Sequence, residues 1–234
     1  MKTTLLALLT ATILSGCVIH VVGGSNNSPK QQSTERFELD ATDLTQLMAS
    51  TGAGSLLIQG EAGRTSVEVI AEIYSYEGID ADIRLHKQGN SAQLQTSLPS
   101  SWVNGNSPYI NLTVKVPTSF GLVLDDGSGE AVIEGLTGDI QVTDGSGDLR
   151  INGGNSLQVD DGSGDLFIRN IKGAVSIEDG SGDMVVEHIG GIVSINDGSG
   201  DISVRQTAGL TITEGGSGDL DIDQINGPVS IAKD

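Results

Sequence analysis

Hydrophobic and polar positions alternate over short stretches in the second half of the chain. Leu166 and Ile168 lie two residues apart, and so do Val175 and Ile177. A period of two is typical of a β-strand with one buried face. The same spacing returns in each following unit, and a further apolar position falls between the two strands of a unit. This further position is held by Leu136, Ile171, Ile189 and Ile225.

A five-residue motif, Asp-Gly-Ser-Gly-Asp or a close variant, separates one unit from the next. It begins at residues 126, 144, 161, 179, 197 and 215, so the step is 17 or 18 residues. Glycine adopts the positive φ that tight turns need, so the motif predicts a corner of the chain. A fixed period of this length indicates a repeat architecture, in which each unit buries its apolar face by stacking on its neighbours.

These patterns predict an all-β fold, a single parallel β-helix (solenoid) with coils of 17 or 18 residues. A triangular hexapeptide solenoid has coils of similar length, but its apolar residues recur at every sixth position, which is not the spacing here. Residues 36–120 are less regular, and they contain one degenerate copy of the coil at 51–58. We expect 36–120 to form a β cap over the first regular coil, because a solenoid needs its terminal coil covered.

The first residues carry a targeting signal rather than part of the fold. Lys2 precedes a short apolar run that is too short to span a bilayer, which is typical of a signal peptide. After its first few residues, the segment 18–34 is polar and rich in Gly, Ser, Asn and Gln, as a flexible tether would be. We therefore divide the chain into a signal peptide at 1–16, a lipidated Cys and tether at 17–35, and a solenoid domain at 36–234, with regular coils at 121–234.

The apolar run ends in Leu14-Ser15-Gly16-Cys17, and Cys17 is the only cysteine of the chain. This ending resembles the lipobox of bacterial lipoproteins. The resemblance implies cleavage before Cys17, acylation of Cys17 and attachment to the membrane through that lipid. Because Val18 rather than Asp follows the cysteine, it also implies an outer-membrane location in the cell envelope if the organism is Gram-negative. The alternative is an ordinary signal peptide with an incidental cysteine.

The folded region resembles a family of bacterial adhesin-like β-strand-repeat proteins. The resemblance rests on residues 110–117, which read as a strand ended by Pro117, and on the coils with Gly-Ser-Gly-Asp corners that continue to Ile231. It implies a β-solenoid but no particular activity, since the family has no general assigned function.

Charge excludes one class of partner. The net charge is −19, and residues 125–234 hold 21 acidic but only 5 basic residues. Such a surface repels nucleic acid and anionic lipid, so we expect no nucleic-acid partner. The Gly-Ser-Gly corner lacks the glycine spacing of a nucleophile elbow, and Asp-Gly-Ser-Gly has the wrong order for an aspartic protease motif. The three histidines lack the spacing of a zinc site, and we expect no enzyme activity.

Stacking places the motif's acidic residues in two columns along the solenoid. Neighbouring carboxylates in a column would be about 5 Å apart and would repel one another. Hydrogen bonds from turn N–H groups, splaying of the side chains into water, or bound cations such as calcium could offset this repulsion. The candidate residues are Asp144, Asp148, Asp161, Asp165, Asp179, Asp183, Asp197 and Asp201.

Two functions remain open from the sequence. The first is a structural or adhesin-like module that binds an envelope protein or glycan with its side walls and uses no cofactor. The second is a calcium-binding solenoid that uses the acidic corner for folding or for linkage to the envelope. The corner motif resembles calcium β-rolls only in part, because its Asp lies one position early and the opposite corner has no acidic ligand. No metal ligand is therefore assigned.

Overall fold

The computed structural model describes residues 29–99 and 107–232, and these residues form strands and turns only. No helix among them is long and apolar enough to cross a membrane. The signal peptide, the lipobox and Cys17 lie outside the described residues. The strands before the regular coils are β1 (Lys30–Asp40), β2 (Gln46–Ser50), β3 (Leu56–Glu61), β4 (Ser66–Ser75), β5 (Asp82–Gln88), β6 (Ser91–Ser97) and β7 (Tyr109–Pro117).

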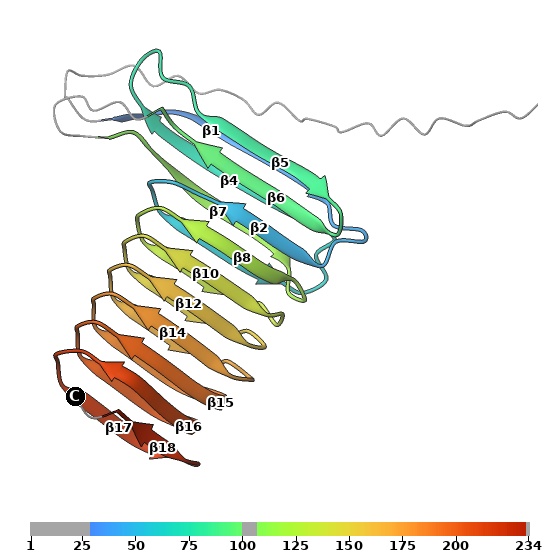
Figure 1. Ribbon diagram of the computed structural model, residues 1–234. Coiled ribbons are helices and arrows are strands. Elements are labelled where there is room, and N and C mark those ends of the chain that lie inside the picture. Colours follow the sequence, from blue (N-terminus) through green and yellow to red (C-terminus); the bar gives the residue numbers. More distant parts are fainter. Residues whose placement is uncertain (1–28, 100–106, 233–234) are drawn as a thin grey trace, which may run out of the picture.

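The regular coils follow as a stack that extends from these strands to the C-terminal end (Figure 1). Their strands are β8 (Gly121–Asp126), β9 (Ala131–Glu134), β10 (Ile140–Asp144), β11 (Leu149–Asn152), β12 (Leu157–Asp161), β13 (Leu166–Arg169), β14 (Val175–Asp179), β15 (Met184–Asp197), β16 (Ile202–Gly215), β17 (Leu220–Ile225) and β18 (Val229–Ile231). β15 and β16 each cover two successive strand positions of a coil and the turn between them.

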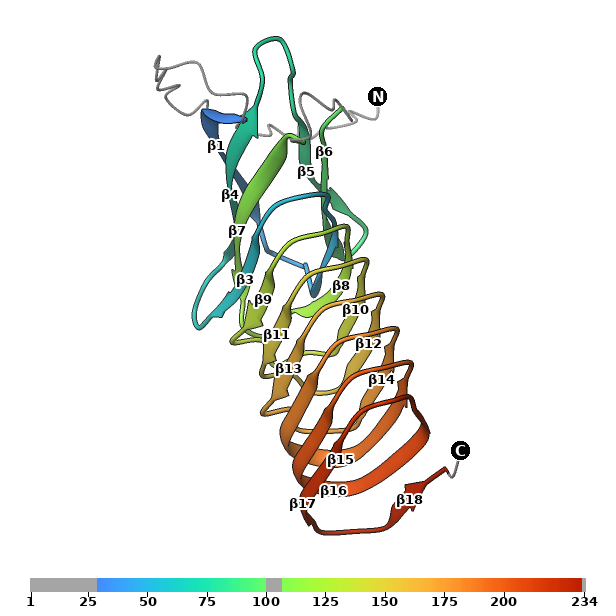
Figure 2. The same cartoon turned by 90° about the vertical axis from the view of Figure 1, so that its left-hand side faces the viewer.

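Each coil contributes one strand to each of two walls, which Figure 2 shows on either side of the core. Wall A has the order β5-β6-β2-β8-β10-β12-β14, continued by parts of β15 and β16 and by β18. Wall B has the order β1-β4-β7-β3-β9-β11-β13, continued by the other parts of β15 and β16 and by β17. The predicted parallel β-helix is therefore confirmed.

Equivalent residues of successive coils pair in register, so each inward position becomes a column of like side chains. Leu149 pairs with Leu166, which in turn pairs with Met184. All three are buried, with exposed fractions of 0–1%. The position predicted in the turn is buried as well, at Leu136, Ile171 and Ile189. The alternation read from the sequence thus identifies the core, and in-register stacking hides apolar surface that a single coil would expose.

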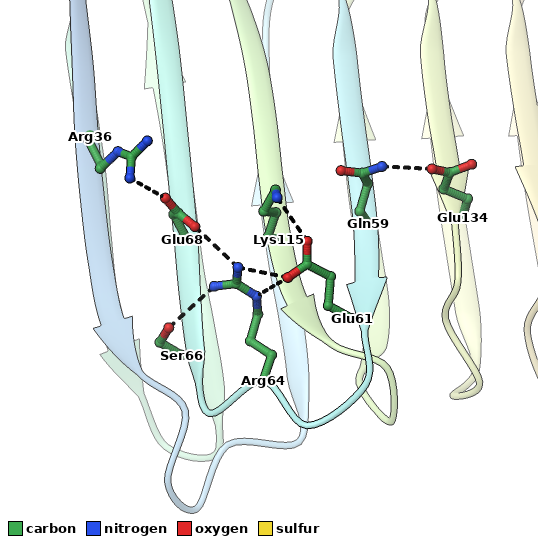
Figure 3. Close-up of polar contacts among 8 residues, drawn as sticks. All are labelled: Arg36, Gln59, Glu61, Arg64, Ser66, Glu68, Lys115 and Glu134. Atoms are coloured by element: carbon green, nitrogen blue, oxygen red, sulfur yellow. Dashed lines mark hydrogen bonds and ion pairs between the residues drawn. The ribbon is translucent and has the colours of Figure 1, made fainter.

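The less regular region closes one end of the stack, as expected. The degenerate coil is β2–β3, which stacks directly on β8–β9. Beyond it the pairing becomes antiparallel: β4 lies between β1 and β7, and β5 pairs with β6. Ion pairs cross these strands, since Glu68 contacts both Arg36 and Arg64, and Glu61 contacts both Arg64 and Lys115 (Figure 3). Antiparallel strands end the parallel stack without leaving an open coil at this end.

The predicted boundary between tether and domain, at residue 35, is wrong. β1 begins at Lys30, and its first residues pair with the end of β4 up to Ser75. An outermost strand is held by backbone hydrogen bonds and needs little apolar character, so the polar composition of 30–35 concealed it. At the other end, the inward residues Leu220, Val229 and Ile231 are 44–49% exposed, because no further coil of the described residues covers them.

The Gly-Ser-Gly corner requires glycine at its second glycine position. Gly164 has φ of 143°, and a Cβ there would lie 1.9 Å from the carbonyl oxygen of Gly147 in the preceding coil. We expect Gly164→Ala to lower the free energy of unfolding by about 3 kcal/mol or more, through backbone strain and a clash with a main chain that cannot move away. Chemical denaturation measures this.

Gly52→Ala is the matched control, because nothing lies within 4 Å of a Cβ at that turn and its φ is not positive. It should change stability by a small fraction of the Gly164→Ala effect. Equal losses in the two variants would contradict the steric account of the corner.

Candidate functional site

The corner aligns the acidic residues of the motif in two columns, as the sequence predicts. The inner Asp column consists of the first residues of successive motifs, which pair in register along wall A. Its members are Asp126, Asp144, Asp161, Asp179 and Asp197. The outer acidic column consists of the fifth residues, which directly precede the strands of wall B. Its members are Glu130, Asp148, Asp165, Asp183, Asp201 and Asp219.

The inner Asp column points into the core. The exposed fractions of its five residues are 0–7%. Splaying into water, which was one expectation for these carboxylates, is therefore wrong for this column. The reason is the strand period: Val142 points inward, Thr143 outward and Asp144 inward again, because the alternation continues to the last residue of β10.

Hydrogen bonding satisfies the inner column only in part. The N–H groups of Ser181 and Ser199 donate to Asp179 and Asp197, each at 3.2 Å. At the centre of the column, neither carboxylate oxygen of Asp144 or of Asp161 has a hydrogen-bond partner. The N–H groups of Ser146 and Gly145 lie near Asp144 and lower its pKa, but the N–H of Gly145 donates its hydrogen bond to the carbonyl oxygen of Asp126. Buried acceptors without donors are costly, so the centre is the most strained part of the column.

Burial raises the pKa of every member of the inner column above its ordinary value of 3.8. The pKa is about 7 at Asp161, where desolvation is the main cause and the charges of Asp144 and Asp179 add to it. The pKa is about 6 at Asp144 and at Asp179, where desolvation is again the main cause and the charge of a neighbouring Asp adds to it. The residues with the fewest hydrogen bonds and the most acidic neighbours thus hold protons most readily.

The outer acidic column is more accessible and better bonded. The N–H groups of Asp183, Asp201 and Asp219 each donate to the carboxylate of the preceding member, at 2.8–3.2 Å. Arg150 bridges Glu130 and Asp148 at 3.1 and 3.2 Å. Hydrogen bonds from the backbone of the adjacent coil, rather than from the residue's own turn, therefore offset the repulsion in this column. Among the described residues, no three acidic, histidine or cysteine side chains are grouped so that they could hold a metal ion.

A column of apolar side chains runs along the outside of wall B. It consists of Leu57, Val132, Phe167 and Val185, which occupy one outward register position in successive coils, with Arg150 between Val132 and Phe167. Outward positions on an exposed sheet are usually polar. The equivalent outward column on wall A starts with Met48 and Val123 and is polar in the coils that follow, where it carries Gln141, Gln158, Ser176 and Ser194.

Arg150 and Phe167 give the apolar column a fixed shape. The guanidinium of Arg150 lies over the ring of Phe167, 4.3 Å from its centre, while its nitrogen atoms bond Glu130 and Asp148. Beside this pair, a groove of about 260 Å³ is lined by Val132, Phe167 and Val185 and by the polar side chains next to them. Arginine and aromatic residues in a shallow groove are typical of protein interfaces.

Sequence reasoning found the two acidic columns but missed the burial of one and the apolar column altogether. Both signals were present in the strand period. Asp144 shares its parity with Ile140 and Val142, which predicts an inward side chain. Phe167 and Val185 have the outward parity of their strands, where a polar residue would be expected.

Comparison with known proteins finds no matching family model and no matching curated protein. Among solved structures, the chain is similar to a putative cell adhesion protein from Clostridium sporogenes ATCC 15579, with 16% identity, a TM-score of 0.43 and coverage of 87% of this chain and 99% of that chain. A putative adhesin from Bacteroides fragilis NCTC 9343 gives 15% identity, a TM-score of 0.43 and coverage of 88% and 99%. Membership of the adhesin-like repeat family stays a prediction.

The bonding of the outer column leads to a prediction about salts. We expect the melting temperature to rise smoothly with ionic strength in sodium chloride, because salt screens repulsion between exposed carboxylates. Calcium chloride at equal ionic strength should give a similar rise. Differential scanning calorimetry in both salts, with a chelator as baseline, measures this. A rise of several degrees at millimolar calcium that sodium does not reproduce would instead support calcium binding by the corner.

Proposed function

We propose that the chain is a non-catalytic, lipid-anchored protein of the cell envelope, and that its solenoid is an adhesin-like module that binds a protein partner. The observation that carries the proposal is the apolar column on the outside of wall B. Phe167 and Val185 are neighbours in this column and line the groove beside Arg150, and contiguous apolar surface of this kind is typical of a binding site.

The surroundings of the apolar column favour a basic partner. The outer acidic column runs beside it through the same coils, and the region 125–234 carries 21 acidic residues against 5 basic ones. A protein surface with an apolar centre and a rim of Lys and Arg would match both features. The same charge disfavours nucleic acid and anionic lipid as partners.

A non-catalytic role agrees with the chemistry of the corner. The inner Asp column is enclosed by apolar side chains, and the described histidines, His86 and His188, are exposed and lie on β5 and β15. Nothing in this arrangement pairs a nucleophile with a base.

The binding surface can be tested by removing its apolar side chains. We expect Phe167→Ser combined with Val185→Ser to abolish capture of partners from envelope fractions, because the centre of an interface supplies most of its binding energy. The bait is the mature chain carrying Cys17→Ser, so that no acyl group contributes. The control is Gln158→Ala combined with Ser176→Ala on wall A, which should capture normally.

The bound material then decides the class of partner. Capture of a basic protein that weakens with salt supports the proposal. Capture that survives the wall B substitutions, or is lost equally in the wall A control, contradicts it. Recovery of a glycan instead of a protein would contradict the proposed partner chemistry.

The lipid anchor at Cys17 has its own test. Cys17→Ser in the full-length precursor should leave the signal uncleaved or release the protein in soluble form, because the lipobox cysteine is the residue that receives the acyl chains. Membrane fractionation and intact mass measure this. The anchor hypothesis fails if the fractionation and the mass of the Cys17→Ser protein match those of the native protein.

A further inference from the structure

The inner Asp column is a feature that the proposed binding function does not use. Five carboxyl groups lie in register, buried in a core of Leu, Ile, Val and Met side chains. Adjacent coils are about 4.8 Å apart, so each carboxyl group adjoins the next. Several negative charges in such a column, without compensation, would cost far more than a domain of this size can tolerate. Something must neutralise them.

Among residues 29–99 and 107–232, no cationic side chain lowers the pKa of any member of the column. On wall A, the charged groups that raise the pKa values in the column are its own members and Asp125 beside Asp126. On wall B, the first strand residues after each corner are buried and uncharged; they are Ala131, Leu149, Leu166, Met184 and Ile202. The remaining contacts are turn N–H groups and the hydroxyl of Thr51, which donates to Asp126 at the end of the column.

A carboxylate only accepts hydrogen bonds, so a column of carboxylates lacks donors along its length. Protonation converts a member into a donor that a neighbouring carboxylate can accept. One proton thus removes a charge and satisfies two of the oxygens that have no partner at Asp144 and Asp161. A proton also needs no added volume, whereas calcium needs six to eight oxygen ligands.

We propose that the inner Asp column is a proton-binding site, in which the carboxyl groups of successive coils share protons through O–H···O hydrogen bonds across the stack. The column ends at Thr51 on one side and at Gly215 on the other, where the motif has no Asp. The bound protons are therefore shared among the five Asp residues of one continuous buried row. They are bound only when the coils are stacked.

Proton binding links the stability of the solenoid to pH. The pKa of Asp161 is about 7 in the folded chain against an ordinary value of 3.8, so the folded state holds more protons than the unfolded state between these values. Stability must then fall as pH rises through this window, and it is highest near its acidic end. This is opposite to the usual behaviour of an Asp that forms ion pairs.

The test compares a buried Asp with its exposed neighbour. We expect the melting temperature of the native protein to fall by several degrees from pH 5 to pH 8. Asp161→Asn should raise the melting temperature at pH 8 and reduce its dependence on pH, because an amide is neutral and both donates and accepts. Asp160→Asn removes the same charge from an exposed outward position and should leave the dependence on pH nearly unchanged.

A second measurement needs no variant. Carbon NMR of the Asp side-chain carboxyl groups in the native protein should show a small set that titrates between pH 5 and pH 8, well above the exposed residues. The proposal is overturned if every Asp has finished titrating by pH 5, or if Asp160→Asn flattens the pH profile as much as Asp161→Asn does. It is also overturned if millimolar calcium, but not sodium, restores stability at pH 8 and Asp161→Asn removes that effect, because a cation then occupies the column.

Discussion

In-register stacking of coils is the constraint on which the structure depends. Each coil has two short strands and two corners, and its apolar face is covered only by the coils on either side. Stacking turns every position of the motif into a column, so the properties of one residue are multiplied along the axis. At Leu149 and Leu166 this multiplication produces a buried apolar core. At Asp144 and Asp161 it produces a row of buried acids.

The same constraint explains why the corner tolerates so little variation. The second glycine of each motif lies against the backbone of the equivalent glycine in the neighbouring coil, as Gly164 does against Gly147 and Gly182 against Gly164. A side chain at this position would separate two coils and disturb the pairing of both walls next to it. The repeated Gly-Ser-Gly thus reflects close contact between backbones, and its repetition needs no functional explanation.

Features of the fold were predictable from the sequence where they depend on local patterns, and were not where they depend on contacts between residues distant in sequence. Strand alternation and a fixed period are local and repetitive, so the parallel β-helix, its core columns and the degenerate coil at 51–58 were predictable. The edge strand that begins at Lys30 was not, because its stability comes from backbone pairing with β4, which is distant in sequence. The apolar column needed both parity and register: Phe167 becomes part of a surface only once Val132 and Val185 are known to lie in the same row.

Burial of the Asp column shows how a repeat can keep a locally unfavourable residue. The first Asp of the motif is well suited to its own turn, since the N–H groups of Ser181 and Ser199 donate to Asp179 and Asp197. The cost arises between coils, where like charges meet in a medium of low polarity. A serine or threonine could also accept a turn N–H without carrying charge, and Thr51 stands at this position in the degenerate coil. The presence of Asp in five consecutive coils is therefore best explained by a property of the carboxyl group that a hydroxyl lacks. Reversible protonation is such a property.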